Sequence, residues 1–314
     1  MIFDAHGDIL TDMYQQKLKN NPNSFKKRHL DLYKKGGVTH SIFVNYTNPY
    51  TKDQNLFSKI FENAFIELEE NNDIFKVCLN YDDMLISLKE EKIGVIVGME
   101  GIKQLKGVNH LRELYQKGVR HASLTWNDEN RYASGLDSPS TRGLTNEGIE
   151  ILDEMESLGM IIDLAHSNEK TFFEILKNTS SPIIISHGNT KALCDHKRNY
   201  TDEQLKAISN RNGVIGICGI RSFIAKEDQF QNVEFLIKHI DHAVKIMGID
   251  HVGLGFDFCY YLGDNTLDNN VDGLKTIADV NNIFIELEKI GYTQEEIEKI
   301  KHLNFERVIK KILK

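Results

Sequence analysis

Eight short apolar runs, separated by amphipathic stretches, constrain the fold of this 314-residue chain most strongly. Runs of this length, bounded by glycine and polar residues, are typical of buried β-strands. Because they are apolar throughout rather than alternating, they favour a parallel sheet that is covered on its outer face. The runs are residues 2–8, 38–46, 93–100, 119–126, 160–166, 182–187, 213–220 and 251–258.

The stretches between these runs carry helical periodicity. Apolar residues spaced three and four apart predict one helix within Val233–Met247 and another within Val280–Ile290. The segment TDEQLKAI, beginning at Thr201, has the pattern of a capping box at a helix start. Helix ends are predicted at four glycines: Gly118, Gly159, Gly248 and Gly291.

Strand–helix alternation over this length predicts an α/β fold, a closed (β/α)8 TIM barrel rather than an open doubly wound sheet. No shift in composition divides the chain, so we expect a single domain over residues 1–314. The formal net charge of -8 argues against nucleic acid or an anionic membrane as the main partner, because both require clustered positive charge.

The sequence also predicts a cytoplasmic protein. No apolar run is long enough for a transmembrane helix, and the N-terminal residues lack the pattern of a signal peptide. The cysteines are scattered without CxxC spacing, which is typical of reduced thiols rather than of a disulfide framework or a zinc knuckle. They are Cys78, Cys194, Cys218 and Cys259.

Polar residues with metal-binding capacity stand at the ends of five of the apolar runs. In a (β/α)8 barrel the carboxyl ends of the strands meet at one mouth, where active sites form. We therefore expect six residues that are far apart in the sequence to converge on one pocket. They are His6 and Asp8, Glu100, His166, His187 and Asp257.

The residue types at these positions indicate a metal site. Strand side chains alternate, so His6 and Asp8 point to the same side and offer a nitrogen and a carboxylate oxygen. Such donors suit zinc, and nearly as well manganese, iron or cobalt. Three histidines and two carboxylates are too many for a closed four-ligand site, but they suffice for two metals sharing one carboxylate. The remaining histidines are interpreted as structural, including His29, His110, His121, His239, His251 and His302.

Seven motifs along the chain resemble, in order and spacing, those of the membrane dipeptidase (renal dipeptidase) family of metal-dependent barrel hydrolases. They are DAHGD, RHLDLYKKGGVTHSIF, GMEG, IIDLAHSN, IIISHGNTKAL, HKRNYTDEQLKAISNRNGVIGI and IDHVGLGFDF. The resemblance implies a (β/α)8 barrel that hydrolyses dipeptides, and in some members related amides with a D-residue on the C-terminal side. It also implies a homodimer.

The resemblance further implies a role for each site residue. One metal ion, with zinc as the first choice, would be bound by His6, Asp8 and Glu100. Glu100 would also bind a second ion and so bridge the two. That second ion would be bound by Glu100, His166 and His187. Asp257 would handle protons, and Arg198 would grip the free carboxylate of the substrate.

These roles fit the chemistry of the residues. Two cations lower the pKa of a bridging water, so that hydroxide is available near neutral pH, and they polarise the scissile carbonyl. Asp257 could take the proton of that water and pass it to the leaving amine. The planar fork of Arg198 matches a carboxylate in two hydrogen bonds, which would select free dipeptides. The structural reading of Arg198 is a helix cap or a surface ion pair.

The chain departs from the family pattern at two places. Many relatives end the fourth strand with a histidine, whereas this chain has Trp126 and Asn127 there. Tryptophan donates one N–H and carries no charge, so both residues are candidate substrate contacts, with simple packing as the alternative for Trp126. After Asp257, relatives often continue with Asp and Gly, whereas Cys259 and Tyr260 follow here. The preference of the relatives for particular substrate side chains therefore cannot be carried over to this chain.

Three other functions compete with a dipeptidase. A deaminase or cyclic-amidase-like barrel would typically begin with His-x-His and often use a modified lysine, whereas this chain has His-x-Asp and Glu100. A barrel that binds a small molecule after losing catalysis would usually lack a metal ligand or the catalytic acid. A carbohydrate-active barrel could use Asp8, Glu100 and Asp257 as paired carboxylates, but it would leave the histidines unexplained.

Overall fold

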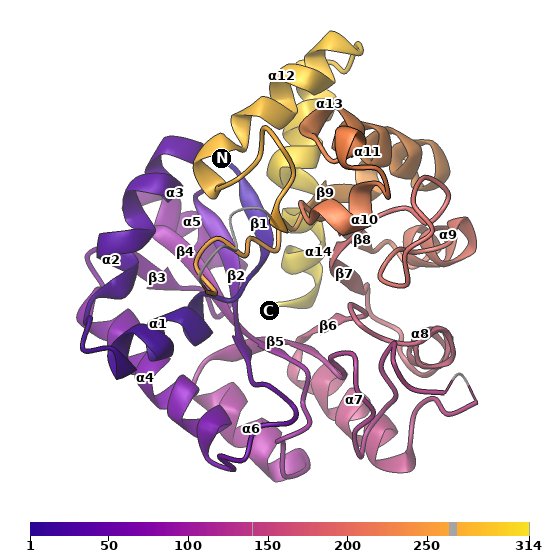
Figure 1. Ribbon diagram of the computed structural model, residues 1–314. Helices are drawn as coiled ribbons and strands as arrows, with labels where there is room; N and C mark the ends of the chain where they lie inside the picture. Colours follow the sequence, from indigo (N-terminus) through magenta and orange to yellow (C-terminus); the bar gives the residue numbers. More distant parts are fainter. Residues whose placement is uncertain (140, 264–268, 314) are drawn as a thin grey trace. The chain divides into compact units, whose positions relative to one another are not determined.

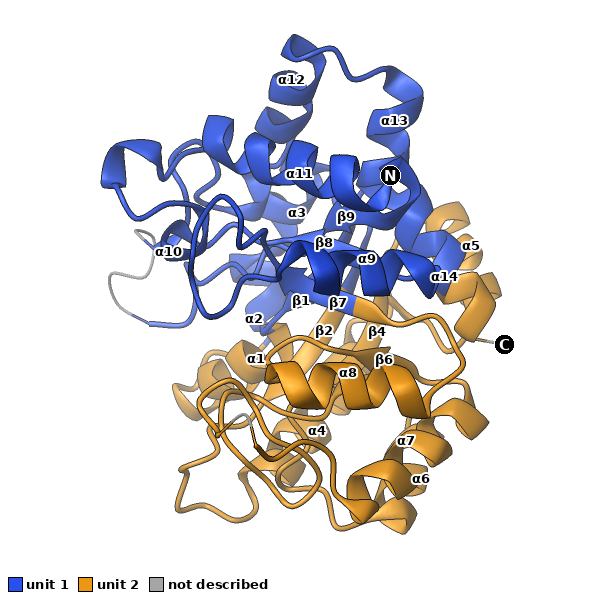
Figure 2. Ribbon diagram, turned by 90° about the vertical axis from the view of Figure 1, so that its right-hand side faces the viewer, with its two compact units in different colours: residues 1–8, 23–41, 185–308 blue, residues 9–22, 42–184, 309–314 orange. Residues whose placement is uncertain are grey.

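The computed structural model of the protein describes residues 1–139, 141–263 and 269–313 (Figure 1). The chain forms two compact units, which Figure 2 colours separately. Unit 1 comprises residues 1–8, 23–41 and 185–308, and unit 2 comprises residues 9–22, 42–184 and 309–314. The assignment of residues 1–314 to a single domain stays a prediction.

Unit 1 is an α/β unit whose strands are β1 (Phe3–Gly7), β7 (Ile184–Gly188), β8 (Val214–Ile217) and β9 (Val252–Leu254). Strands β7, β8 and β9 are neighbours in this order, and β8 pairs with β9 in parallel. Phe256, just beyond β9, donates its N–H to Asp4 on β1. The helical segments are α2 (Ser24–Arg28), α3 (Leu30–Gly36), α9 (Asp202–Asn210), α10 (Arg221–Ile224), η1 (Asp228–Phe230), α11 (Val233–Met247), η2 (Ile249–His251), η4 (Ile277–Asp279), α12 (Asn281–Lys289), α13 (Gln294–Glu298) and the π-helical η5 (Lys299–Leu303). The last helix, α14 (Asn304–Ile312), begins in unit 1 and ends in unit 2.

Unit 2 has the same α/β character. Its strands are β2 (His40–Tyr46), β3 (Phe75–Val77), β4 (Ile93–Glu100), β5 (Val119–Ser123) and β6 (Ile161–Asp163). The order is β2-β4-β5-β6, with β3 beside β4, and the β3–β4, β4–β5 and β5–β6 pairs are parallel. The helices are α1 (Ile9–Leu18), α4 (Leu56–Glu70), α5 (Tyr81–Lys89), α6 (Val108–Gln116), α7 (Asn146–Leu158) and α8 (Glu169–Asn178).

The strands are covered on both faces, as their continuous apolar runs predict. Every residue of β1, β4, β5 and β7 is buried. Such burial requires helices over the strands and leaves the strand ends as the place where polar side chains reach a cavity or solvent.

The helical predictions are confirmed where the sequence gave a specific signal. α11 spans Val233–Met247, and α9 begins after Thr201 with a complete capping box in which Gln204 is the partner. Gly159 ends α7 in a left-handed conformation with φ of 71°, which glycine adopts without steric cost. No helix in the described part of the chain is both long and apolar enough to cross a membrane.

Eight strands coincide with the eight predicted runs, but four of them end three or more residues earlier than predicted. β5 ends at Ser123 rather than at Trp126, and β6 at Asp163 rather than at His166. β8 ends at Ile217 rather than at Ile220, and β9 at Leu254 rather than at Phe258. The physical reason at two of these places is backbone conformation. His166 has φ of 66° and Asp257 has φ of 54°, and neither value is compatible with an extended strand. The short strand β3 was not predicted.

Candidate metal centre and active site

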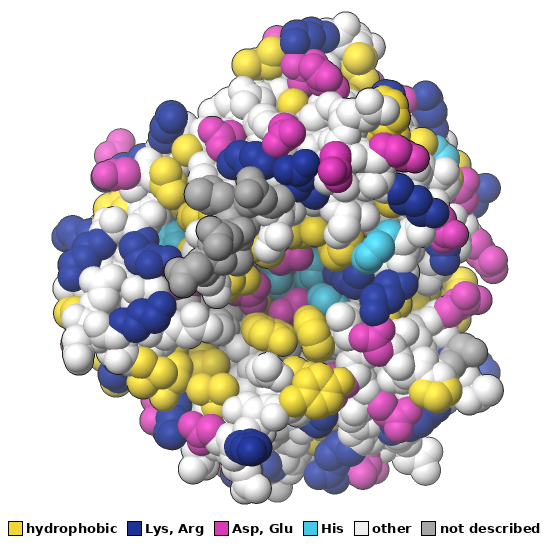
Figure 3. Space-filling view, in the orientation of Figure 1, with side chains coloured by type: hydrophobic (Ala, Val, Ile, Leu, Met, Phe, Trp, Pro, Cys, Tyr) yellow, Lys and Arg dark blue, Asp and Glu magenta, His cyan; other side chains and the backbone are white. Residues whose placement is uncertain are grey.

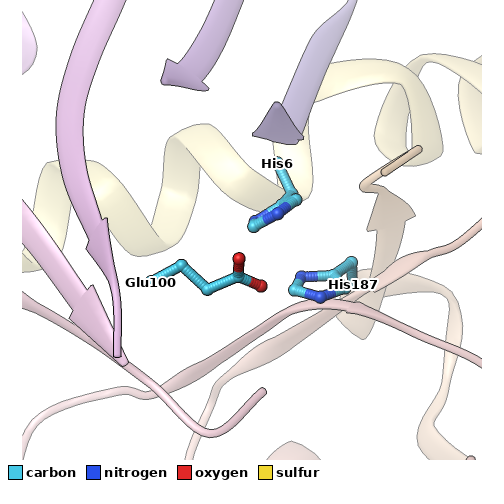
Figure 4. Close-up of side chains that lie close together, drawn as sticks. All are labelled: His6, Glu100 and His187. Atoms are coloured by element: carbon cyan, nitrogen blue, oxygen red, sulfur yellow. The ribbon is translucent and has the colours of Figure 1, made fainter. Parts of the chain in front are cut away.

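Unit 1 gathers imidazole and carboxylate groups at the ends of β1, β7 and β9. The rings of His6 and His187 have centroids 3.8 Å apart (Figure 4). His6 Nε2 lies 4.0 Å from Asp8 Oδ2 and 3.9 Å from Asp257 Oδ1. One ligand atom from each of His6, Asp8 and Asp257 lies within 4.8 Å of the others, which is a geometry that could hold a metal ion. Histidine and acidic side chains lie side by side on the face that Figure 3 shows.

The electrostatics of this group favour a cation. Burial raises the pKa of Asp8 well above its usual value, and the nearby charge of Asp257 raises it further. Burial also raises the pKa of Asp257 to about 6, although Arg198 and a hydrogen bond from Cys218 act in the opposite direction. Asp8 Oδ1 is buried without a hydrogen-bond partner among the described residues. A divalent cation would compensate a buried, unpaired carboxylate oxygen, so the residues present fit the implied metal.

Two residues that sequence analysis did not single out support this group. Asp4 Oδ1 accepts hydrogen bonds from His6 N at 3.3 Å and from Phe256 N at 3.0 Å, and burial raises its pKa to about 7. Tyr261 Oη accepts the N–H of Asp8 at 3.0 Å. A charged residue inside an apolar run is a signal that could have identified Asp4. No sequence signal connects Tyr261 with Asp8, because 253 positions separate them.

Arg198 also belongs to unit 1 and is buried, with 4% of its surface exposed. Its Nη2 donates to the carbonyl oxygen of His187 at 3.4 Å, and its guanidinium lies 5.6 Å from the ring centroid of Phe223. Nη1 is buried without a hydrogen-bond partner among the described residues. These contacts differ from those of a surface ion pair. A carboxylate ligand would satisfy the remaining donor.

Asp257 is held in an unusual backbone conformation. Its φ of 54° lies in the left-handed region, which non-glycine residues enter at an energetic cost and which recurs at functional sites. The thiol of Cys218 lies 3.9 Å from Asp257 Oδ2, and the thiol of Cys259 lies 3.6 Å from its carbonyl oxygen. The following Tyr260 Oη lies 3.4 Å from Nδ1 of the buried His29, so this departure from the family pattern packs into an aromatic cluster.

Unit 2 brings together the other four predicted site residues. Glu100, which Figure 4 also labels, ends β4, and its Oε1 lies 2.9 Å from His166 Nε2. His166 Nδ1 lies 2.7 Å from Asn127 Oδ1, and the ring of Trp126 has its centroid 5.9 Å from that of His166. The backbone of Trp126 can pack closely against Gly101, which follows Glu100, because a Cβ on Gly101 would lie 2.9 Å from the backbone nitrogen of Trp126. Glu100 and His166 are buried, whereas Trp126 and Asn127 are half-buried.

Comparison with known families and proteins gives a consistent result. The family described as membrane dipeptidase, peptidase family M19, matches residues 1–314. An uncharacterized protein from the pqqA 5′ region of Klebsiella pneumoniae is 33% identical over 247 residues, covering 76% of this chain and 89% of that protein. An uncharacterized dipeptidase of Schizosaccharomyces pombe is 30% identical over 279 residues, covering 86% of this chain and 65% of that protein. The dipeptidase tcpJ of Claviceps purpurea is 28% identical over 323 residues, covering 98% of this chain and 74% of that protein.

Solved structures confirm the fold class. A metallopeptidase from Rhodobacter sphaeroides, liganded with a phosphinate mimic of the dipeptide L-Ala-D-Ala, has a TM-score of 0.87 at 22% identity, with 99% of each chain covered. An amidohydrolase from Pseudomonas aeruginosa has a TM-score of 0.84 at 21% identity, with 100% of this chain and 96% of that chain covered. The predicted α/β barrel fold is thus confirmed.

Proposed function

The chain belongs to the membrane dipeptidase family of metallopeptidases, and from this premise we propose that it hydrolyses the amide bond of free dipeptides at a pair of divalent metal ions. The observation that carries the metal dependence is the group of buried His6, buried Asp8 and half-buried Asp257, with ligand atoms within 4.8 Å of one another. Burial without compensating partners destabilises such carboxylates unless a cation is bound.

Five side chains are proposed as the metal ligands. His6, Asp8 and His187 belong to unit 1, and Glu100 and His166 belong to unit 2. Following the family pattern, Glu100 is assigned as the carboxylate shared by both ions. Imidazole nitrogens with carboxylate oxygens suit zinc, and the same set accepts manganese, iron or cobalt. Two bound cations would supply a water of lowered pKa, hence hydroxide near neutral pH, and would polarise the scissile carbonyl.

Asp257 is assigned as the group that moves protons. A carboxylate takes a proton from an attacking water and returns it to the leaving amine most effectively when its pKa lies near the working pH. Burial raises the pKa of Asp257 to about 6 in the metal-free protein, and bound cations would lower it from that value. Its left-handed backbone conformation is of a kind that recurs at functional sites.

Arg198 is assigned as the residue that binds the free carboxylate of the dipeptide. Its guanidinium is buried and offers a donor, Nη1, that no described residue accepts. A bidentate pair with a substrate carboxylate would favour dipeptides over amidated or longer peptides. The ligand bound to the Rhodobacter sphaeroides metallopeptidase mimics L-Ala-D-Ala. We extend this to the proposal that the present chain accepts dipeptides with a C-terminal D-residue. Its cytoplasmic location and homodimeric state stay predictions from the sequence.

The test is a substrate screen on purified protein with counted metal. We expect two equivalents of divalent metal by mass spectrometry, and hydrolysis of L,L or L,D dipeptides in a library tested with zinc, manganese and cobalt. Dihydropyrimidines and adenosine serve as substrates for the competing cyclic-amidase and deaminase activities. Turnover of either of these without any dipeptide cleavage, or less than one metal per chain, would refute the proposal.

A further inference from the structure

We propose that Asn127 is a positioning residue that fixes the tautomer and the orientation of His166. The inference rests on the proposed function in one respect, since it takes His166 to be a metal ligand. Its observations all lie within unit 2. Asn127 Oδ1 and His166 Nδ1 are 2.7 Å apart, although 39 positions separate the two residues in the sequence.

The direction of this hydrogen bond determines which ring nitrogen can bind a metal. A carboxamide oxygen only accepts, so the proton of the neutral imidazole lies on Nδ1. Nε2 then carries the lone pair, and it is the atom that lies 2.9 Å from Oε1 of Glu100. With the proton on Nδ1, the lone pair of Nε2 faces the proposed bridging carboxylate across this distance. Two acceptors so close repel each other unless a cation binds both, which is what a metal ion would do. A histidine ligand whose other nitrogen donates to an oxygen is held in the metal-binding tautomer.

One short backbone segment holds both partners of the hydrogen bond. Leu136 N donates to the carbonyl oxygen of His166 at 3.1 Å, and Asp137 N donates to that of Asn127 at 2.8 Å. Gly135 precedes them, and a Cβ there would lie 2.1 Å from the carbonyl oxygen of Trp126. Residues 135–137 thus fix the backbones of Asn127 and His166 against each other, so the two side chains need little further ordering to meet.

The ring of His166 is constrained from other directions as well. Its backbone has φ of 66°, a conformation that persists in non-glycine residues only where the surroundings enforce it. The ring of Trp126 is inclined by 31° to the imidazole at a centroid distance of 5.9 Å. The oxygen of Asn127, which a substrate contact would use as its acceptor, is already engaged by His166. This geometry favours a positioning role over the substrate contact expected from the sequence.

The first test measures metal affinity. Asn127→Ala should weaken binding of one of the two zinc ions by about 10- to 100-fold in a competition titration with a chromogenic chelator. The affinity of the other ion should change little. Asn127→Asp should restore the affinity, because a carboxylate oxygen accepts the same Nδ1 proton. Trp126→Phe is the matched control, since it keeps an aromatic ring beside His166 and leaves the hydrogen bond intact.

The second test reads the tautomer in the metal-free protein by ¹⁵N NMR with labelled histidine. The His166 resonance is assigned by its loss in His166→Gln. The wild type and Asn127→Asp should show a proton on Nδ1, and Asn127→Ala should show a mixture of tautomers. An unchanged tautomer together with unchanged affinity for both ions in Asn127→Ala would overturn the inference. Wild-type protein that binds no metal would instead overturn the proposed function, while the tautomer signal would still decide the role of Asn127.

Discussion

The most informative residues are three acidic side chains whose pKa values lie above the usual range. Asp4, Asp8 and Asp257 lie together in unit 1, and burial raises the pKa of each of them. A protein could have reduced this cost with lysine or arginine partners, or with apolar residues of similar size. The position of Asp8 and Asp257 next to His6 indicates that these two acidic groups serve a cation and a reaction rather than stability.

The role of Asp257 predicts a large kinetic effect from a small change. Asp257→Asn removes the proton-accepting group but keeps the size of the side chain, and asparagine tolerates the left-handed φ of 54°. We expect kcat for a good dipeptide to fall by about 10²- to 10⁴-fold, because general acid–base catalysis contributes on that order. Steady-state kinetics and metal analysis of the same preparation measure this. The control is Asp250→Asn, which changes an exposed acid. Near-normal turnover by Asp257→Asn with both metals bound would show that another group moves the proton.

The role of Arg198 predicts a loss of substrate discrimination. Arg198→Ala removes the buried guanidinium, so kcat/KM for free dipeptides should fall by about 10- to 100-fold, as expected for one charge-assisted hydrogen-bonded pair. C-terminally amidated analogues, which lack the carboxylate, should be affected much less. Arg198→Lys should recover only part of the loss, because an ammonium group cannot form the bidentate pair. The assignment is wrong if Arg198→Ala keeps the wild-type preference for free over amidated substrates.

The predicted metal ligands and Asp257 share one property: each stands at or near the end of an apolar run. His6, Glu100 and His187 are visible for that reason. The positioning contact of Asn127 was not predictable, because it depends on how the irregular segment after β5 folds back onto the residues after β6. Backbone hydrogen bonds of such segments follow no periodicity in the sequence.

At the scale of elements, α11 anchors the segment that follows β7. His239 on this helix is fully buried, with Nδ1 2.9 Å from Thr190 Oγ1 and Nε2 2.8 Å from the carbonyl oxygen of Ile224. Burial lowers the pKa of His239 from 6.5 to about 4, so the imidazole stays neutral in the folded protein. Acid would therefore weaken the hydrogen bonds through which neutral His239 holds this segment.

His239 therefore predicts a pH dependence of stability. Between pH 6.5 and 4 the unfolded chain binds a proton that the folded protein does not, so the free energy of unfolding decreases as the pH falls through this window. At pH 5 the contribution of this group is a loss of about 2 kcal/mol relative to pH 7. Urea denaturation of the wild type and of His239→Gln at both pH values separates the contribution of His239 from that of other titrating groups. Equal pH dependence in the two proteins would contradict the assignment.

The elements also show where sequence patterns stop being informative. The eight strands were predictable because buried parallel strands are continuously apolar, and α11 because its apolar stripe follows the helical period. β3 spans only Phe75–Val77, too short for a periodic signal. The early ends of β6 and β9 follow from the left-handed backbones of His166 and Asp257, which no apolar pattern encodes.

At the scale of the whole molecule, the proposed ligands are divided between the two compact units, so that neither unit alone contains the complete set. Unit 1 contributes His6, Asp8 and His187, and unit 2 contributes Glu100 and His166. The sequence suggested no such division, because its composition is uniform along the chain. Bound metal would stabilise the folded state to which it binds.

This predicts a measurable cost of metal removal. Dialysis against a chelator should abolish dipeptide hydrolysis and lower Tm, because ions that bind only the folded state stabilise it, by about 2.7 kcal/mol at a concentration 100-fold above Kd. Zinc added back to two equivalents should restore both activity and Tm. Asp8→Asn provides the decisive comparison: it removes the buried carboxylate whose Oδ1 lacks a partner among the described residues. The metal-free variant should match or exceed the metal-free wild type in Tm, yet gain less from zinc. A wild-type Tm that is indifferent to chelation and to added zinc would mean that these carboxylates are not metal ligands.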